Sequence, residues 1–394
     1  MKQIILGLTL ASLGASAAWA ASPPDGEYLT RAADCVACHT AEGGQPFAGG
    51  RTFKTLFGTL YSTNITPDRD TGIGNYTDDE FVAALHQGIG RGGRHLYPVM
   101  PYNSYSMMSR EDALAIKQYL SSLTPVHVDA PRNQMRFPFN QRWTLGVWNE
   151  VNNPAHPYEA DATKSSEWNR GAYLVNAVAH CGQCHTPRNW MQGLSTRGMA
   201  GAMEQGWLAY NITQDRAHGI GGWSDTELIQ YLSTGTAPNH GPTSGPMAEA
   251  ITNSLRFLKP EDVRAMVTYL RTVAPRPDGP PANAAPPKAV AVTSLGEKIF
   301  AQACAGCHLP NGFGRQSDWA ALAGDHSAAD PRANNVLQVL AHGSEVKTGK
   351  GLMFMHRFTG AYTDPELAAV ANYVVETFGN QQGEITGKDL EAAK

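Results

Sequence analysis

The sequence predicts an all-α protein built from three similar domains in tandem. Three observations favour this fold class. A Cys-x-x-Cys-His motif occurs three times in the 394 residues. A short helix is expected immediately before each copy, and an amphipathic helix is expected to close each unit. The three motifs are Cys35–His39, Cys181–His185 and Cys304–His308.

The chain begins with a predicted secretory signal peptide at residues 1–20. Lys2 gives it a positive start, residues 4–18 form a short apolar stretch, and Ala18-Trp19-Ala20 has the small residues of a cleavage site. A membrane anchor is the alternative interpretation. The stretch is short and rich in Ala, Gly and Ser, which favours cleavage and export to the periplasm.

The first domain is expected at residues 22–150. We predict its leading helix near Gly26 and its closing helix over residues 110–122. Ser109 is a suitable N-cap for the closing helix, and acidic residues follow it in the first turn. The apolar residues of this helix recur at three- and four-residue spacing; they are Leu114, Ile116, Tyr119 and Leu120.

The second domain is expected at residues 165–274, with a leading helix near Gly171 and a closing helix over residues 261–273. Its loop Asn211–Arg216 repeats the loop Asn64–Arg69 of the first domain. This similarity indicates that the two domains are duplicates. We interpret the Asn-x-Thr triplets in both loops as turns rather than as glycosylation acceptors.

The segment that joins these domains, residues 124–168, is too apolar to be a free linker. It packs between the two domains in one interpretation, and in the other it forms a docking surface for a partner subunit. Its aromatic residues include Phe137, Phe139, Trp143 and Trp148.

A Pro-rich linker is predicted at residues 275–288, where six prolines favour an extended, semi-rigid chain. The third domain follows at residues 290–380, with a leading helix near Gly296 and a closing helix over residues 365–378. The last segment, residues 381–394, is a polar tail.

The three motifs indicate covalent haem attachment. In such a site the two cysteines bond to the haem and the adjacent histidine binds the iron. All six cysteines of the chain fall inside the motifs. The cysteine pairs are too far apart in the sequence for a zinc site, and a thioredoxin-like pair needs no following histidine. We therefore expect three haem c groups, bound by Cys35, Cys38, Cys181, Cys184, Cys304 and Cys307, with His39, His185 and His308 on the iron.

A methionine between each motif and its closing helix is expected to supply the sixth iron ligand. Met100 follows His39 by 61 residues, and Met247 follows His185 by 62. The third domain is less clear. Met355 is the preferred ligand there, and Met353 and His356 are the alternatives. For the first haem, Arg51, Arg91 and Arg94 are candidate donors to the propionates.

Composition excludes some partners. The formal net charge is −4, and no basic run or stripe occurs, so nothing indicates nucleic-acid binding. After residue 20, no stretch reaches the roughly 20 apolar residues of a membrane-spanning helix.

The order of helix, motif, loop and helix resembles the class I cytochrome c domain. Beyond that plan, the sequence resembles the tri-haem cytochrome c subunits of bacterial periplasmic dehydrogenases. The segments that carry this resemblance are Ala33–Thr40, Phe47–Gly50, Phe57–Asp68, Gly93–Tyr102, His180–Asn189 and Gly245–Glu249.

The resemblance implies an electron-transfer subunit without catalytic residues of its own. Such a subunit takes electrons from a flavin, quinone or molybdenum dehydrogenase and passes them to ubiquinone or a terminal oxidase. It works in the periplasm, and peripheral attachment to the membrane through partners stays open. Two alternatives remain: a haem enzyme, such as a peroxidase or sulfur-compound oxidase, that uses an open third haem, and a free electron shuttle.

Overall fold

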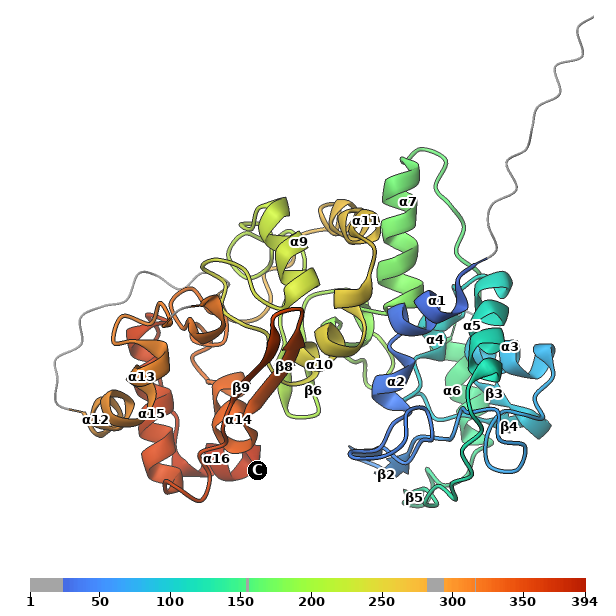
Figure 1. Ribbon diagram of the computed structural model, residues 1–394, viewed down its shortest axis with the longest axis horizontal. Coiled ribbons are helices and arrows are strands. Elements are labelled where there is room, and N and C mark those ends of the chain that lie inside the picture. The colour runs from blue at the N-terminus through green and yellow to red at the C-terminus, as the bar shows by residue number, and fades with distance from the viewer. Residues whose placement is uncertain (1–23, 154–155, 282–293, 316) are drawn as a thin grey trace, which may run out of the picture.

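The computed structural model describes residues 24–153, 156–281, 294–315 and 317–394. The predicted signal peptide and the second half of the predicted linker lie outside the described residues. We call residues 24–153 the first unit, 156–281 the second and 294–394 the third. Figure 1 shows the three units in a row, with the second, drawn in green and yellow, between the other two.

Each unit begins with a leading helix and a motif turn and contains a closing helix. The first unit contains α1 (Gly26–Ala32), α2 (Cys35–Cys38), β1 (Thr52–Thr55), β2 (Gly58–Tyr61), α3 (Asp78–Gln87), β3 (Ile89–Gly90), η1 (Arg91–Gly93), β4 (Arg94–His95), α4 (Tyr102–Tyr105), α5 (Arg110–Ser122), β5 (Gln134–Met135) and α6 (Thr144–Asn152). The second contains α7 (Ser166–Tyr173), η2 (Leu174–Val178), α8 (Gly182–His185), β6 (Ala202–Glu204), β7 (Trp207–Ala209), α9 (Asp225–Thr234), α10 (Gly245–Asn253), η3 (Leu255–Phe257) and α11 (Pro260–Leu270). The third contains α12 (Leu295–Ile299), η4 (Phe300–Cys304), α13 (Ala305–His308), η5 (Asp318–Ala320), α14 (Asn334–His342), β8 (Ser344–Thr348), β9 (Gly351–Met355), α15 (Asp364–Thr377) and α16 (Gly387–Ala393).

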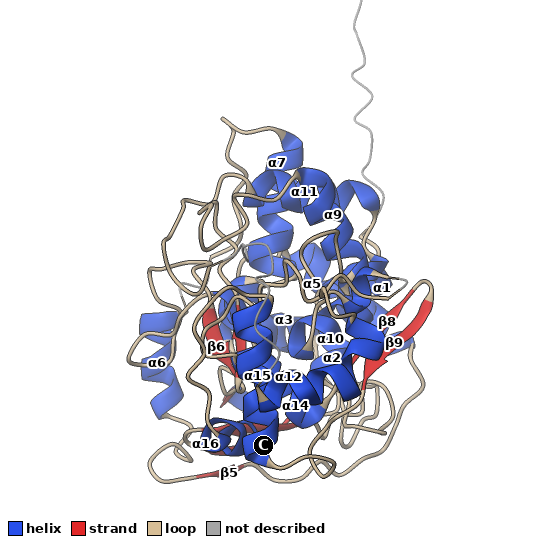
Figure 2. Ribbon diagram, turned by 90° about the vertical axis from the view of Figure 1, so that its left-hand side faces the viewer, coloured by secondary structure: helices blue, strands red, loops and turns tan. Residues whose placement is uncertain are grey.

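The prediction of an all-α fold is wrong. The described residues also form a three-stranded sheet, β1-β2-β5, and three two-stranded sheets, which pair β3 with β4, β6 with β7 and β8 with β9. These strands are only two to five residues long, as in β3 and β8. They were missed because so short a segment shows no readable alternation of apolar and polar residues. Figure 2 shows the short strands, in red, at separate places among the helices.

The predicted leading and closing helices are confirmed, and glycines fix how they cross. A Cβ atom added at Gly26, Gly171 or Gly296 would lie 1.8–2.0 Å from a backbone carbonyl oxygen of the closing helix. No side chain fits in that space, so the two helices approach to backbone contact only because glycine stands there. The three oxygens belong to Ala115, Ala265 and Ala369.

The first and second units share one hydrophobic core. Buried residues of both units, such as Ile116 and Val263, belong to the same cluster. The third unit contributes Val346 to that cluster and has two further clusters of its own. Reciprocal, partly buried hydrogen bonds join the first two units. Tyr28 of α1 donates to Asp262 of α11 at 2.5 Å, and Tyr173 of α7 donates to Asp112 of α5 at 2.5 Å.

The third unit contacts the second through the hairpin β8–β9, the ring of His326 and two hydrogen bonds between Asn335 and Leu208. The hairpin β8–β9 extends toward α10, where the backbone N–H of Lys347 donates to Thr252 Oγ1 at 3.0 Å. The ring of His326 stacks on the ring of Tyr210, with 4.0 Å between the ring centroids. These contacts place the third unit against the second rather than the first.

Candidate haem-attachment sites

Each motif forms a single helical turn at the end of the leading helix. In the first unit this turn is α2, and Cys35 and Cys38 stand three positions apart, so that both lie on the same side of the turn. None of the six cysteines forms a disulfide. Burial raises the pKa of both thiols in this turn to about 12. A protonated, desolvated pair is the opposite of a reactive thioredoxin-like pair, which depends on a lowered thiol pKa.

The three motif histidines are all held in the same way. The Nδ1 atom of His39 lies 2.6 Å from the carbonyl oxygen of Thr63, and that of His185 lies 2.6 Å from the carbonyl oxygen of Tyr210. In the third unit, His308 Nδ1 lies 2.8 Å from a carbonyl oxygen, that of Ala320.

This hydrogen bond fixes the tautomer of each ring and leaves Nε2 available to bind an iron. Burial also lowers the pKa of each of the three imidazoles, which favours the neutral form that binds iron. The residues present therefore fit a haem c at each motif: two thiols on one side of a turn, and a neutral, oriented imidazole beside them.

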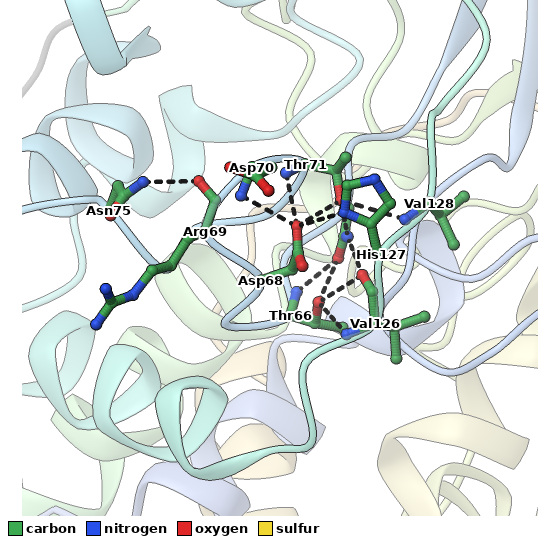
Figure 3. Close-up of polar contacts among 10 residues, drawn as sticks. Thr66, Asp68, Arg69, Asp70, Thr71, Asn75, Val126, His127 and Val128 are labelled. Atoms are coloured by element: carbon green, nitrogen blue, oxygen red, sulfur yellow. Dashed lines mark hydrogen bonds and ion pairs between the residues drawn. The ribbon is translucent and has the colours of Figure 1, made fainter.

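Hydrogen-bonded loops hold the carbonyl acceptors of the first two histidines. Asn64, which directly follows Thr63, donates to the carbonyl oxygen of Val126 at 2.7 Å and accepts from Thr66 N–H at 2.8 Å. Figure 3 shows Thr66 bonded to Val126, and Thr71 bonded to Asp68 and to Val128.

The second unit repeats this scaffold behind Tyr210. Asn211 donates to the carbonyl oxygen of Arg276 at 2.6 Å, and Thr213 N–H donates to Asn211 Oδ1 at 2.8 Å. The Asn-x-Thr triplets of the two units therefore act as turns that fix the carbonyl acceptor of the motif histidine. Residues of the predicted Pro-rich linker complete the second scaffold, so this part of the linker is packed.

An arginine binds the loop between the two cysteines of every motif. These contacts were not predicted from the sequence. In each case its side chain donates to the carbonyl oxygen of the residue just before the second cysteine, at 2.5–2.7 Å. The three pairs are Arg51 with Ala37, Arg188 with Gln183, and Arg315 with Gly306.

The arginines predicted as propionate donors in the first unit differ in their surroundings. Arg51 binds the loop between the two cysteines, which we call the attachment loop, and its role as a propionate donor stays a prediction. Arg91 and Arg94 are both exposed, and Arg91 lies 3.9 Å from a carboxylate oxygen of Glu80.

Met100 and Met247 occupy matching places in the first two units. Met100 lies two residues before α4, and its backbone N–H donates to the carbonyl oxygen of Tyr97 at 3.2 Å. Met247 lies in the first turn of α10, directly after Pro246. Both side chains are half-buried and pack against the shared core. Their assignment as iron ligands stays a prediction.

The third unit presents its methionines on a hairpin instead. Met353 and Met355 lie on the same half-buried face of β9, and Leu352 and Phe354 point to the exposed face. The two methionines pack against different cores. Met353 contacts the core of the first two units, whereas Met355 contacts the third unit's own core.

The segment between the first two units packs with one face only. In α6, Trp148 Nε1 donates to the carbonyl oxygen of Met191 in the second unit at 2.9 Å, and Asn149 accepts from Tyr102 at 2.7 Å. The opposite face carries three apolar side chains that are well exposed: Trp143, Val147 and Val151, at 70%, 59% and 64%.

Among the described helices, none combines the length and apolar character needed to cross a bilayer.

The cytochrome c family model matches residues 24–124 and 293–378. Full-length relatives support the same assignment. The chain is 37% identical to the fructose dehydrogenase cytochrome subunit of Gluconobacter japonicus, over 94% of this chain and 82% of that protein. It is 33% identical to the gluconate 2-dehydrogenase cytochrome c subunit of Pantoea cypripedii, over 99% and 94%.

A third relative is much longer than this chain. A nicotinate dehydrogenase subunit of Pseudomonas putida is 40% identical over 94% of this chain, but the chain spans only 31% of that protein. Cytochromes c carry haem bound covalently through Cys-x-x-Cys-His motifs, which agrees with the motif geometry above. The chain belongs to the family of cytochrome c subunits of bacterial dehydrogenases.

Proposed function

We propose that this chain is the electron-transfer subunit of a periplasmic dehydrogenase and that it carries three haems c. The observation that carries the proposal is the threefold repetition of one arrangement: a cysteine pair on a single turn, followed by a histidine held through Nδ1 by a carbonyl oxygen. The partner would be the catalytic subunit, as the names of the relatives indicate for those proteins. Ubiquinone or a terminal oxidase would be the acceptor.

Each haem would be held by four residues. The first would take Cys35, Cys38, His39 and Met100. The second would take Cys181, Cys184, His185 and Met247. The third would take Cys304, Cys307, His308 and Met355. When bound, haem supplies an iron that gains and loses one electron.

The residues of the chain set the properties of those irons. The carbonyl acceptors orient the imidazoles, and a thioether as sixth ligand favours the reduced iron and closes it to substrates. The packing of Met355 against the third unit's own core supports it over Met353 as the third ligand, because Met353 contacts the core of the other two units. A closed third iron would also disfavour the haem-enzyme alternative.

The partner proposal is tested by purification from the native host, with the chain carrying a C-terminal affinity tag. We expect a dehydrogenase catalytic subunit to copurify and its substrate to reduce the haems in the complex. Recovery of the chain alone, with no dehydrogenase activity, would instead support the free electron shuttle. Mass spectrometry of the mature chain would give the number of attached haems and show whether residues 1–20 have been removed.

A further inference from the structure

The first two attachment loops are each bound by the unit that does not contain them. In the second motif, Gln183 lies between the two cysteines. Its Nε2 atom donates to Asn103 Oδ1 at 2.9 Å and to Ser104 Oγ at 2.7 Å. Both acceptors lie in α4 of the first unit, which begins two residues after Met100. The second attachment loop therefore contacts the segment that carries the first unit's proposed methionine ligand.

The first attachment loop makes the reciprocal contact through an ion pair. Arg51 donates from Nη1 to the carbonyl oxygen of Ala37 at 2.5 Å, and from Nη2 to Glu249 Oε2 at 2.8 Å. Nη1 also bonds to the other oxygen of Glu249, so the pair is bidentate. Glu249 lies in α10 of the second unit, two residues after Met247. One guanidinium thus joins the first haem site to the helix of the second proposed methionine ligand.

The other arginines in this role lack such a cross-unit partner. Arg188 lies 3.5 Å from Glu204, which belongs to the same unit. Among the described residues, Arg315 donates a hydrogen bond to its attachment loop but forms no ion pair. Of these three arginines, Arg51 is therefore the one that pairs with a carboxylate of another unit.

The Arg51–Glu249 pair is partly shielded from solvent. The Arg51 and Glu249 side chains are 29% and 34% exposed, so bulk water screens their charges only in part. Asp34 is the other carboxyl group that faces Arg51. Burial and the nearby Glu249 carboxylate raise the pKa of Asp34, which favours its neutral form. Glu249 is thus the main anion that offsets the arginine.

We infer that Arg51 and Glu249 are positioning residues through which the second unit tunes the reduction potential of the first haem. This inference rests on the proposed function, because it requires a haem at Cys35 and Cys38. Reduction adds an electron to the site, so a nearby positive charge favours the reduced form and a nearby negative charge favours the oxidised form. Arg51 stands at the attachment loop with its charge offset by a carboxylate from the other unit.

Variants that remove the charge of either residue test the inference, because they should shift the reduction potential of the first haem in opposite directions. The full chain is titrated spectroelectrochemically, and the first haem is assigned by comparison with Met100→Ala. Glu249→Gln should make the first haem easier to reduce, because Arg51 is then unopposed. Arg51→Gln should make it harder to reduce. We expect each change to alter the equilibrium constant for reduction by about threefold or more. Arg51→Lys keeps the charge and should shift the potential less than Arg51→Gln.

Glu204→Gln is the matched control, because it removes the carboxylate near Arg188 without touching the first unit. It should change the second haem and leave the first unchanged. The inference would be overturned if Glu249→Gln and Arg51→Gln shift the reduction potential of the first haem in the same direction, or if neither shifts it. A merely structural role gives no reason for the two variants to have effects of opposite sign. Mass spectrometry of the same samples counts the attached haems. A wild-type chain without haem at Cys35 and Cys38 would refute the proposed function instead.

Discussion

At the scale of single residues, the motif histidines could be predicted from sequence but their partners could not. The motif fixes the histidine beside its cysteines. The carbonyl acceptors, however, lie 24, 25 and 12 residues further along the chain. The arginines on the attachment loops follow their histidines by 12, 3 and 7 residues. The first two acceptors have nearly equal spacings because the two units are duplicates, but the third acceptor and the arginines share no common spacing. Tertiary folding rather than local sequence brings these residues to the motif.

The choice between two methionines can also be tested at this scale. Met355→Ala should remove the thioether from the third iron, lower the potential of that haem and change its absorption spectrum. Met353→Ala should leave the spectrum unchanged, because that side chain packs against the core of the first two units. Absorption spectra and redox titrations of the two variants give the answer. If Met353→Ala or a His356 variant changes the third haem and Met355→Ala does not, the proposed ligand is wrong.

At the scale of elements, the long periodic helices were predictable and the short strands were not. The predicted closing helix over residues 110–122 coincides with α5, and the other two closing helices differ from their predictions by at most three residues at either end. The hairpin β8–β9 had no comparable signal. Its residues Gly351–Met355 contain the third candidate ligand, so the sequence left the geometry of that ligand undetermined.

The crossing of leading and closing helices makes a second prediction. Gly171→Ala would place a Cβ 1.8 Å from the carbonyl oxygen of Ala265 and must push α7 away from α11. We expect a loss of about 1–3 kcal/mol in the free energy of unfolding, as for other overpacked sites. Gly198→Ala is the control, since no atom lies within 4 Å of a Cβ built there. Denaturant unfolding followed by circular dichroism measures both; equal stability of the two variants would contradict the close crossing.

At the scale of the whole molecule, the motifs predict three units but not how the units associate. One interpretation of the apolar segment at residues 124–168 placed it between the first two units. Nothing in the sequence indicated a common core, because the contacts join residues far apart in the chain. Tyr28 and Asp262, which lie in different units, are one example. The exposed apolar face of α6 shows a similar limit. Its aromatic residues were recognised, but only the structure shows that one face packs while the other stays open.

The ion pair at the junction of the first two units predicts a dependence on pH. Burial raises the pKa of Asp262, but hydrogen bonds from Arg170 and Tyr28 outweigh it and leave the pKa below its ordinary value. A lowered folded-state pKa stabilises the protein above the unfolded-state value of about 3.9, and this stabilisation is lost as the pH falls through the folded-state value. Asp262→Asn should therefore cost about 1–2 kcal/mol at pH 7 and progressively less in acid.

Unfolding free energies of wild type and Asp262→Asn at a series of pH values would check this. The exposed pair of Asp79 with Arg110 offers a control, because Asp79→Asn should cost little at any pH. A difference between wild type and Asp262→Asn that stays constant from neutral to acid pH would rule out the carboxylate as its source.

The common core of the first two units also determines how the protein comes apart. Residues that bury one another lose their packing together, so these two units should melt as a single cooperative block although each has its own motif. Apart from Val346 on the hairpin β8–β9, the clustered buried residues of the third unit lie in separate clusters, so this unit should melt by itself. Calorimetry should then resolve two transitions rather than three. On heating, the sites at Cys35 and Cys181 would unfold in the same transition, while the site at Cys304 would unfold at a different temperature.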